Sequence, residues 1–166
     1  MHKLKHVFWF WFGSLLLLAG GCVLDPGDAC PSGDCYGNSH AQDSQQHEHK
    51  IDSMVGDHAA VQRFLEQLQD AVAADDRKTV ANMVSYPLNV DLYGNESRIL
   101  NPRQFLMFYD DLMNQKVVAA IRQQRYSQLF VNYEGAMIGD GEVWISSACS
   151  GEQCSPEQIK ITAINP

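Results

Sequence analysis

Residues 61–72 read VQRFLEQLQDAV, and their apolar side chains recur at the spacing of one helix face. The stripe consists of Val61, Phe64, Leu65, Leu68, Ala71 and Val72. This pattern predicts an amphipathic helix that turns one face toward a core. Asp57 can cap this helix or sit in its first turn, and Asp75-Asp76 mark its exit.

The next part of the chain alternates short helical and extended segments. Residues 80–84 continue as a second, shorter helix, which Pro87 stops because proline lacks a backbone N–H. Residues 88–92 alternate apolar and polar side chains and predict a strand. Gly94-Asn95 then turns the chain into a brief extended piece that ends at Leu100.

Asn101-Pro102 is a strong helix start, with Asn as the N-cap and Pro at the first helical position. The helix that follows carries a core-facing stripe, and Asn114 begins another helical segment. The stripe consists of Phe105, Phe108, Tyr109, Leu112 and Met113, and the later segment carries Val117, Val118 and Ile121.

The last third of the chain is rich in predicted strands. They cover residues 129–133, 136–138, 142–148 and 158–164. Glu134-Gly135 and Gly139-Asp140-Gly141 supply turns between the first three. Helices followed by a run of antiparallel strands predict an α+β fold, in which the N-terminal helices pack on a curved, mostly antiparallel sheet.

This order of elements resembles the nuclear transport factor two-like superfamily, a cone-shaped α+β fold shared by ketosteroid isomerases. Tyr86-Pro87-Leu88, the helix of residues 105–113 and the segment 139–144 fall where the family places its short strands, its third helix and its long hairpin. The resemblance covers residues 54–166. It implies a pocket between helices and sheet, which the family's enzymes line with Asp, His and Tyr.

The N-terminus resembles a bacterial lipoprotein signal peptide. A basic start and an apolar run lead to the lipobox-like Leu18-Ala19-Gly20-Gly21-Cys22. The resemblance implies cleavage after residue 21 and lipid on Cys22, and Val23 behind it favours the outer membrane, facing the periplasm. The apolar run is shorter than a transmembrane helix needs. An ordinary secretory signal fits its charge and length but gives no reason for the cysteine.

Residues 22–53 are predicted to form a flexible polar tether, because the segment has few apolar side chains and many Gly, Pro, Ser, Gln and Asp residues. The α+β domain then covers residues 54–166. His40, His47 and His49 lie in this tether. They are interpreted as solvated linker residues, with weak binding of a transition metal as the alternative.

Four cysteines remain once Cys22 is set aside for lipid, and they form two pairs, Cys30 with Cys35 and Cys149 with Cys154. In an exported protein an even count indicates disulfides, and the two local pairings are favoured among the three connectivities. Zinc is the alternative, although the spacing is not the usual C-x2-C.

No catalytic motif, metal site or cofactor is predicted. His58 is the only histidine expected in the folded part, and Asp91, Asp110 and Asp111 are interpreted as solvated carboxylates. Aromatic residues could instead rim a concave pocket, with packing in the core as the alternative. The candidate pocket residues are Tyr86, Tyr109, Tyr126 and Trp144.

Charge limits the class of partner. The whole chain has 12 basic and 20 acidic side chains, and removing Lys3 and Lys5 with the leader leaves 10 against 20, a formal charge of −10. Such a polyanion is a poor ligand for nucleic acid. The sequence predicts a non-enzymatic, lipid-anchored module that binds a small apolar ligand or a protein, such as an inhibitor or immunity protein toward a basic envelope enzyme or toxin. The alternative is a small cone-fold isomerase, dehydratase or cyclase acting on a hydrophobic metabolite.

Overall fold

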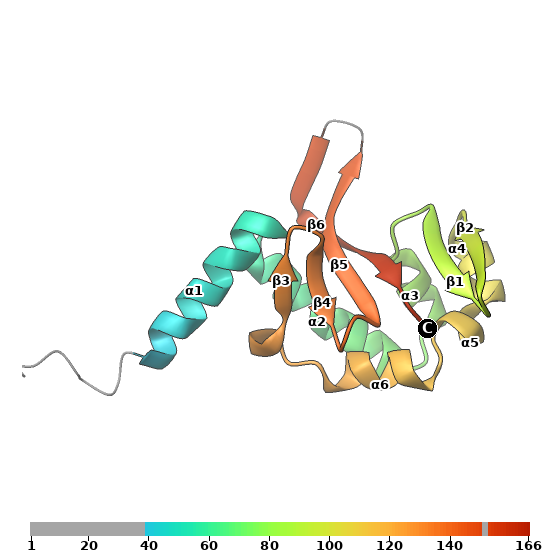
Figure 1. Cartoon of the computed structure of the whole chain (residues 1–166), viewed down its shortest axis with the longest axis horizontal. Coiled ribbons are helices and arrows are strands. Elements are labelled where there is room, and N and C mark those ends of the chain that lie inside the picture. The colour runs from blue at the N-terminus through green and yellow to red at the C-terminus, as the bar shows by residue number, and fades with distance from the viewer. Residues whose placement is uncertain (1–38, 151–152) are drawn as a thin grey trace, which may run out of the picture. The chain divides into compact units, whose positions relative to one another are not determined.

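The computed structural model describes residues 39–150 and 153–166 (Figure 1). The leader, Cys22, Cys30 and Cys35 lie outside the described residues. The helices are α1 Ser39–Met54, α2 His58–Ala73, α3 Arg77–Asn82, α4 Pro102–Met107, α5 Tyr109–Leu112 and α6 Gln115–Gln123, and a 3-10 turn covers Tyr126–Gln128. The strands are β1 Leu88–Leu92, β2 Asn95–Ile99, β3 Phe130–Asn132, β4 Gly135–Ile138, β5 Val143–Ser150 and β6 Gln153–Ile164. The predicted α+β class is confirmed.

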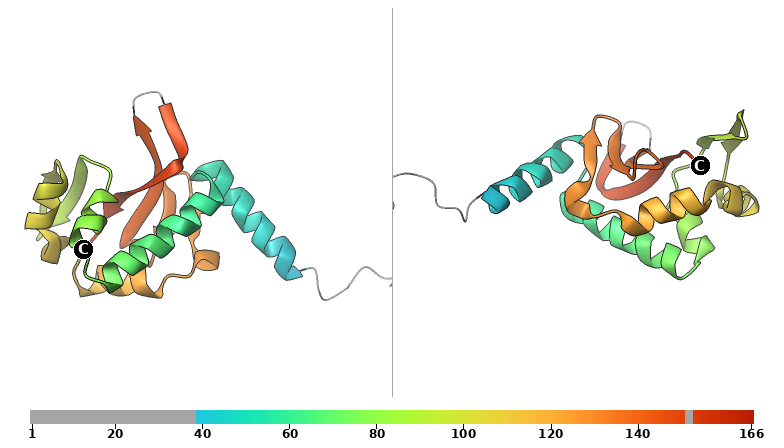
Figure 2. Two further views of the ribbon diagram at one scale, coloured as in Figure 1. Left: turned by 180° about the vertical axis from the view of Figure 1, so that it is seen from behind. Right: turned by 60° about the horizontal axis from the view of Figure 1, so that its bottom comes forward.

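Helix α2 is the predicted amphipathic helix, and every residue of its apolar stripe is buried. Asp57 is its N-cap, since the carboxylate accepts a hydrogen bond from the backbone N–H of Ala60 at 2.6 Å. The helix packs against β6 and α6, and Figure 2 shows α2 and α6 running side by side beneath the sheet. Burial of this stripe is the main hydrophobic contribution of the helix to stability.

The main sheet is antiparallel, with strand order β3-β4-β5-β6. β5 and β6 are longer than predicted and form a hairpin whose register shifts between Trp144 and Ile145 and again between Ser147 and Ala148. Such bulges bend strands and increase their twist, which curves the sheet. β1 and β2 form a separate two-stranded sheet at the predicted position, with Leu88 opposite Ile99.

The register of the β5–β6 hairpin makes Cys149 and Cys154 Cα partners on neighbouring strands. Directly opposed residues on antiparallel strands have Cα atoms about 4.5–5.5 Å apart, within the range that a disulfide spans. The backbone is therefore compatible with the predicted bond, which stays a prediction.

Both asparagine caps lie where the sequence places them. The Asn101 side chain accepts from the N–H of Gln104 at 3.0 Å, and that of Asn114 accepts from the N–H groups of Lys116 and Val117. The predicted stripe is wrong at Phe108, which is exposed. Its backbone leaves the helical conformation between α4 and α5, and this break turns the ring away from the core.

Residues 39–53 form most of α1, which corrects the prediction of a flexible tether up to residue 53. Ile51 is fully buried, and Val55 just after the helix is also in the core. The Val55 carbonyl accepts a hydrogen bond from the N–H of Ser147 on β5 at 3.1 Å. The folded domain therefore includes α1. In the part of the chain that the structure describes, no helix is long and apolar enough to cross a bilayer.

Candidate functional site

The structure places the four predicted pocket aromatics in three different surroundings, and only Tyr86 and Tyr109 share one. Tyr86 and Tyr109 each pack edge-on against Phe105, with ring centroids 6.5 and 5.9 Å away, and the Tyr86 hydroxyl donates to the carbonyl of Ala81 at 2.7 Å. Burial raises the pKa of both phenols. These two rings are part of the core around α4 and α5. The prediction that Tyr86 and Tyr109 line a pocket is therefore replaced by the alternative, packing in the core.

Tyr126 belongs to a different contact. Its ring packs edge-on against His47 of α1 at 5.6 Å, and burial raises the pKa of its hydroxyl to about 12. The His47 ring nitrogen Nε2 lies 3.1 Å from the Tyr126 carbonyl oxygen. Trp144 is half-buried on β5. His47 and Tyr126 thus dock α1 on the domain, and His47 is no linker residue.

None of the three aspartates considered as a catalytic base is buried. Asp91 and Asp110 are exposed, and half-buried Asp111 accepts a hydrogen bond from the hydroxyl of Tyr93. A carboxylate that acts as a base on a bound substrate is usually enclosed with it in a pocket, and none of these three is buried. These three residues therefore do not form an acid–base site.

Glu142 is the one buried charged residue within the described segments, and the sequence reasoning missed it. Its carboxylate pairs with Lys116 Nζ at 3.1 Å and accepts from the backbone N–H of Asp140 at 2.6 Å. Burial raises the pKa of Glu142, but hydrogen bonds from the N–H groups of Asp140 and Glu142 and from Lys116 outweigh it, so the net pKa is lowered. The Glu142 carboxylate therefore stays ionised, and its two contacts hold the turn at Asp140 next to α6. The Gly139-Asp140-Gly141 turn before it was the available signal.

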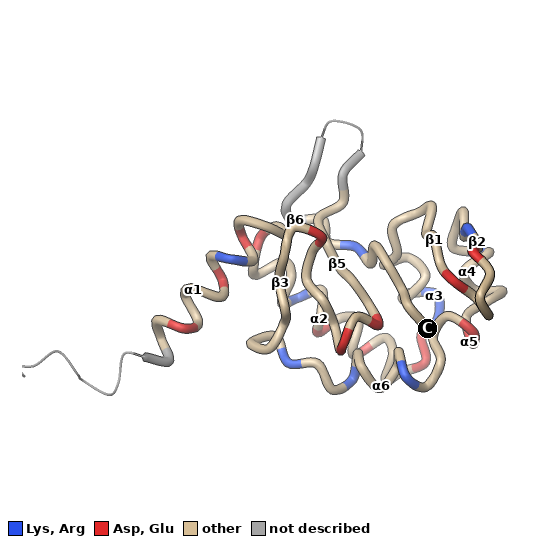
Figure 3. The backbone as a smooth tube through the Cα atoms, viewed as in Figure 1, with Lys and Arg blue, Asp and Glu red and all other residues tan. Residues whose placement is uncertain are grey.

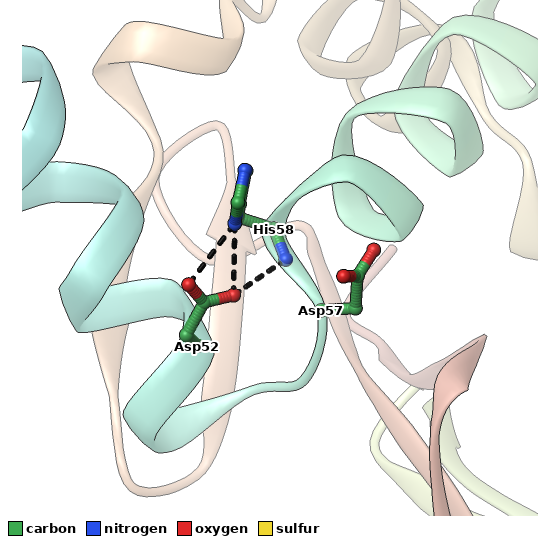
Figure 4. A group of neighbouring side chains, drawn as sticks. All are labelled: Asp52, Asp57 and His58. Atoms are coloured by element: carbon green, nitrogen blue, oxygen red, sulfur yellow. Dashed lines mark hydrogen bonds and ion pairs between the residues drawn. The ribbon is translucent and has the colours of Figure 1, made fainter.

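Asp52, Asp57 and His58 form a polar cluster where α1 meets α2, with one ligand atom of each within 4.8 Å of the others (Figure 4). Asp52 Oδ1 accepts from the His58 backbone N–H at 2.8 Å, and both Asp52 oxygens lie 3.0 Å from His58 Nδ1. Figure 4 shows the Asp57 carboxylate turned toward α2, where it caps the helix. The cluster therefore fastens α1 to α2.

The side-chain bond to Asp52 raises the pKa of His58, and the nearby carboxylates Glu48 and Asp57 add to this. For Asp52, desolvation raises the pKa, but the backbone and side-chain hydrogen bonds from His58 outweigh it and the net pKa is lowered. Each group thus favours the charged form of the other.

Four exposed large apolar side chains lie on α4 or in the segments beside α4 and α5, and we call this set the α4–α5 face. They are Tyr93 (84 % exposed), Met107 (77 %), Leu100 (54 %) and Phe108 (40 %). Tyr93 reaches α5 through its hydrogen bond to Asp111. Leu100 joins α4 through its backbone N–H, which donates to Gln104 Oε1 at 2.7 Å.

Carboxylates border this face, and Figure 3 shows acidic positions along the β1–β2 hairpin and α5. Asp110 pairs with Arg77 at 2.9 Å, and Arg77 also pairs with Asp75 at 3.2 Å and lies 4.6 Å from the centroid of the Tyr109 ring. Arg77 is therefore occupied on three sides, and Asp111 has no ion pair in the described structure. The β1–β2 hairpin, α4 and α5 carry four carboxylates, Asp91, Glu96, Asp110 and Asp111, against two cations, Arg98 and Arg103, so the balance of charge on these elements is acidic.

No protein-family model, curated protein or solved structure matches this chain. Its function therefore has to be inferred from its own residues.

Proposed function

We propose that the chain is a bacterial lipoprotein, held in the outer membrane by lipid on Cys22 and facing the periplasm, whose domain binds a basic protein partner. The lipobox-like segment 18–22 and Val23 support the anchor and the membrane. After the leader the chain has 20 acidic and 10 basic side chains, and this negative charge would attract a positively charged partner. We also propose that the domain has a nuclear transport factor two-like fold, because its helices and strands follow one another in a similar order.

The α4–α5 face is the observation that carries the binding role. Exposed apolar side chains rimmed by polar groups mark interaction sites, and interfaces are richest in aromatic residues and Met. Tyr93, Met107 and Phe108 supply these residue types, and Asp110 and Asp111 border them. A partner that presents Lys or Arg around an apolar contact complements this face. Electrostatic attraction would speed its association. An inhibitor or immunity protein toward a basic envelope enzyme or toxin is the specific form that we favour.

The enzyme alternative requires a carboxylate buried in a cavity. Asp91 and Asp110 are exposed, which leaves buried Glu142, at the edge of a concave site beside α6, as its candidate group. Backbone N–H groups and Lys116 lower the pKa of Glu142 and hold it ionised and engaged in the turn, so we favour the binding role.

Site-specific photocrosslinking in the source bacterium tests the binding role. A crosslinking amino acid replaces Met107 in the full chain, and exposed Gln123 on α6 is the matched control position. We expect a discrete adduct with a basic protein from Met107 alone, and its loss when Asp110 and Asp111 are both changed to Asn. Equal adducts from both positions, or an acidic partner, would overturn the proposal.

Intact-mass analysis of the mature chain from the same cells tests the anchor separately. A chain that begins at residue 22 and carries acyl groups is expected, and Cys22→Ser should leave the leader uncleaved. An unmodified Cys22 would refute the anchor and leave the crosslinking result standing.

A further inference from the structure

A concave site of about 250 Å³ lies between α2 and β6. It shares no residue with the α4–α5 face. Its lining consists of Ala60, Arg63, Phe64, Gln67, Met83, Gln158, Ile159 and Lys160. Two cations, two amides and four apolar residues thus surround one small space, and none of these lining residues is acidic.

This charge is opposite to that of the chain, in which acidic residues outnumber basic ones by 20 to 12. Lys160 Nζ donates to the backbone carbonyl of Asn82 at 2.7 Å, and it has no acidic partner among the side chains that the structure describes. The guanidinium of Arg63 lies 3.9 Å from the Asp57 carboxylate, and its side chain is 63 % exposed. Asp57 is already engaged as the cap of α2. Lys160 is therefore available to an anion in this space, and Arg63 can join it by giving up a loose ion pair with Asp57.

The lining also has an apolar part. Phe64, Met83 and Ile159 are buried core residues whose surfaces reach this space. The amides of Gln67 and Gln158 add donors and acceptors. A bare inorganic ion would use the cations alone, whereas a ligand with an apolar body would also cover Phe64 and Met83.

We propose that the site between α2 and β6 binds a small organic anion, a carboxylate attached to an apolar body. Arg63 presents the planar fork that matches a carboxylate in two parallel hydrogen bonds, and Lys160 adds a point charge. The volume is below the 300–1,000 Å³ of pockets for drug-sized ligands, so the ligand is small. This binding role goes beyond the proposed contact with a basic protein and does not depend on it.

Methyl NMR of the full chain in detergent, with methionine methyl groups labelled, tests this site. The Met83 methyl reports on the site, and the Met113 methyl, buried away from it, is the internal control. Benzoate is the probe, and benzamide is its neutral counterpart of the same shape. Millimolar benzoate should shift the Met83 signal saturably and leave Met113 unchanged, while benzamide should have no effect.

Arg63→Gln and Lys160→Gln should each weaken benzoate binding by about fivefold, the effect of one exposed ion pair. Arg122→Gln on α6, which removes an exposed cation elsewhere, should leave it unchanged. Equal binding of benzamide, no saturable shift of Met83, or unaltered affinity in Arg63→Gln would overturn the proposal. Inorganic phosphate that binds as well as benzoate would overturn the role assigned to the apolar lining.

Discussion

Glu142 Oε1 lies 3.1 Å from Lys116 Nζ, so a buried carboxylate ahead of β5 is joined to an exposed lysine on α6. The other oxygen, Oε2, accepts from the backbone N–H of Asp140, which fixes the turn between β4 and β5. Two parts of the chain that are distant in sequence are therefore held together by one side chain.

Glu142→Ala should destabilise the domain by about 2–3 kcal/mol, because it leaves the Asp140 N–H without its acceptor and removes a buried charged partner. Urea unfolding followed by circular dichroism measures this loss. The matched control is Glu134→Ala, which removes an exposed carboxylate at the preceding turn and should change stability by less than about 0.5 kcal/mol. Equal effects of the two substitutions would contradict the role of Glu142.

The Asp52–His58 contact should make the attachment of α1 depend on pH. The pKa of His58 is raised above 6.5, so its contribution is complete below pH 6.5 and is lost as the pH rises through the folded-state pKa. The pKa of Asp52 is lowered below 3.8, so its contribution is complete above pH 3.8 and is lost as the pH falls through the folded-state pKa.

Both groups are partly exposed, so we expect at most about 1 kcal/mol from this pair. Amide hydrogen exchange of α1 relative to α2, measured between pH 5 and 8, should become faster toward high pH beyond the intrinsic dependence. Asp52→Asn should abolish the difference. A pH response that survives in Asp52→Asn would contradict the role of the Asp52–His58 pair.

Ile51→Ala should cost about 2–4 kcal/mol of unfolding free energy, because Ile51 is fully buried and its removal leaves a cavity between α1 and the core. Met54→Ala, at the C-terminal end of the helix where the side chain is 45 % exposed, is the control and should cost far less. Thermal unfolding distinguishes the two. A negligible effect of Ile51→Ala would mean that α1 is not part of the folded domain.

The opposed positions of Cys149 and Cys154 predict a disulfide that links β5 to β6. On the loop-entropy account, a bond that closes so short a loop contributes about 2 kcal/mol. Non-reducing peptide mass spectrometry should detect the linked peptides, and Cys149→Ser with Cys154→Ser should lower the melting temperature. Bound zinc at one equivalent with both thiols reduced would favour the metal alternative.

The features predicted well from sequence are those fixed by neighbouring residues. The stripe of α2, the asparagine caps of α4 and α6, and strand β1 all depend on patterns within about ten residues. Phe108 was misplaced because its own backbone leaves the helical conformation between α4 and α5, whereas Tyr109, Leu112 and Met113 after this break are buried as predicted.

Features that depend on distant contacts were missed. Helix α1 has a polar composition, so its sequence does not indicate that it packs on the core. It is held there by buried Ile51 and by the contact of His47 with Tyr126, which lies 79 residues further along the chain. Glu142 looks like an ordinary strand residue until α6 places Lys116 beside it. Of the candidate pocket aromatics, Tyr86, Tyr109 and Tyr126 each pack edge-on against another ring, and composition cannot assign such partners.

Helix α1 has a consequence for whatever precedes it. A helix rises 1.5 Å and rotates 100° per residue, so the 16 residues of Ser39–Met54 make a rod about 24 Å long with a definite rotational phase. One residue inserted in its exposed half, at residues 41–46, would swing the attachment point of the preceding chain around the rod axis. Inserting seven residues, close to two full turns, would nearly restore that azimuth while lengthening the spacer by about 10 Å.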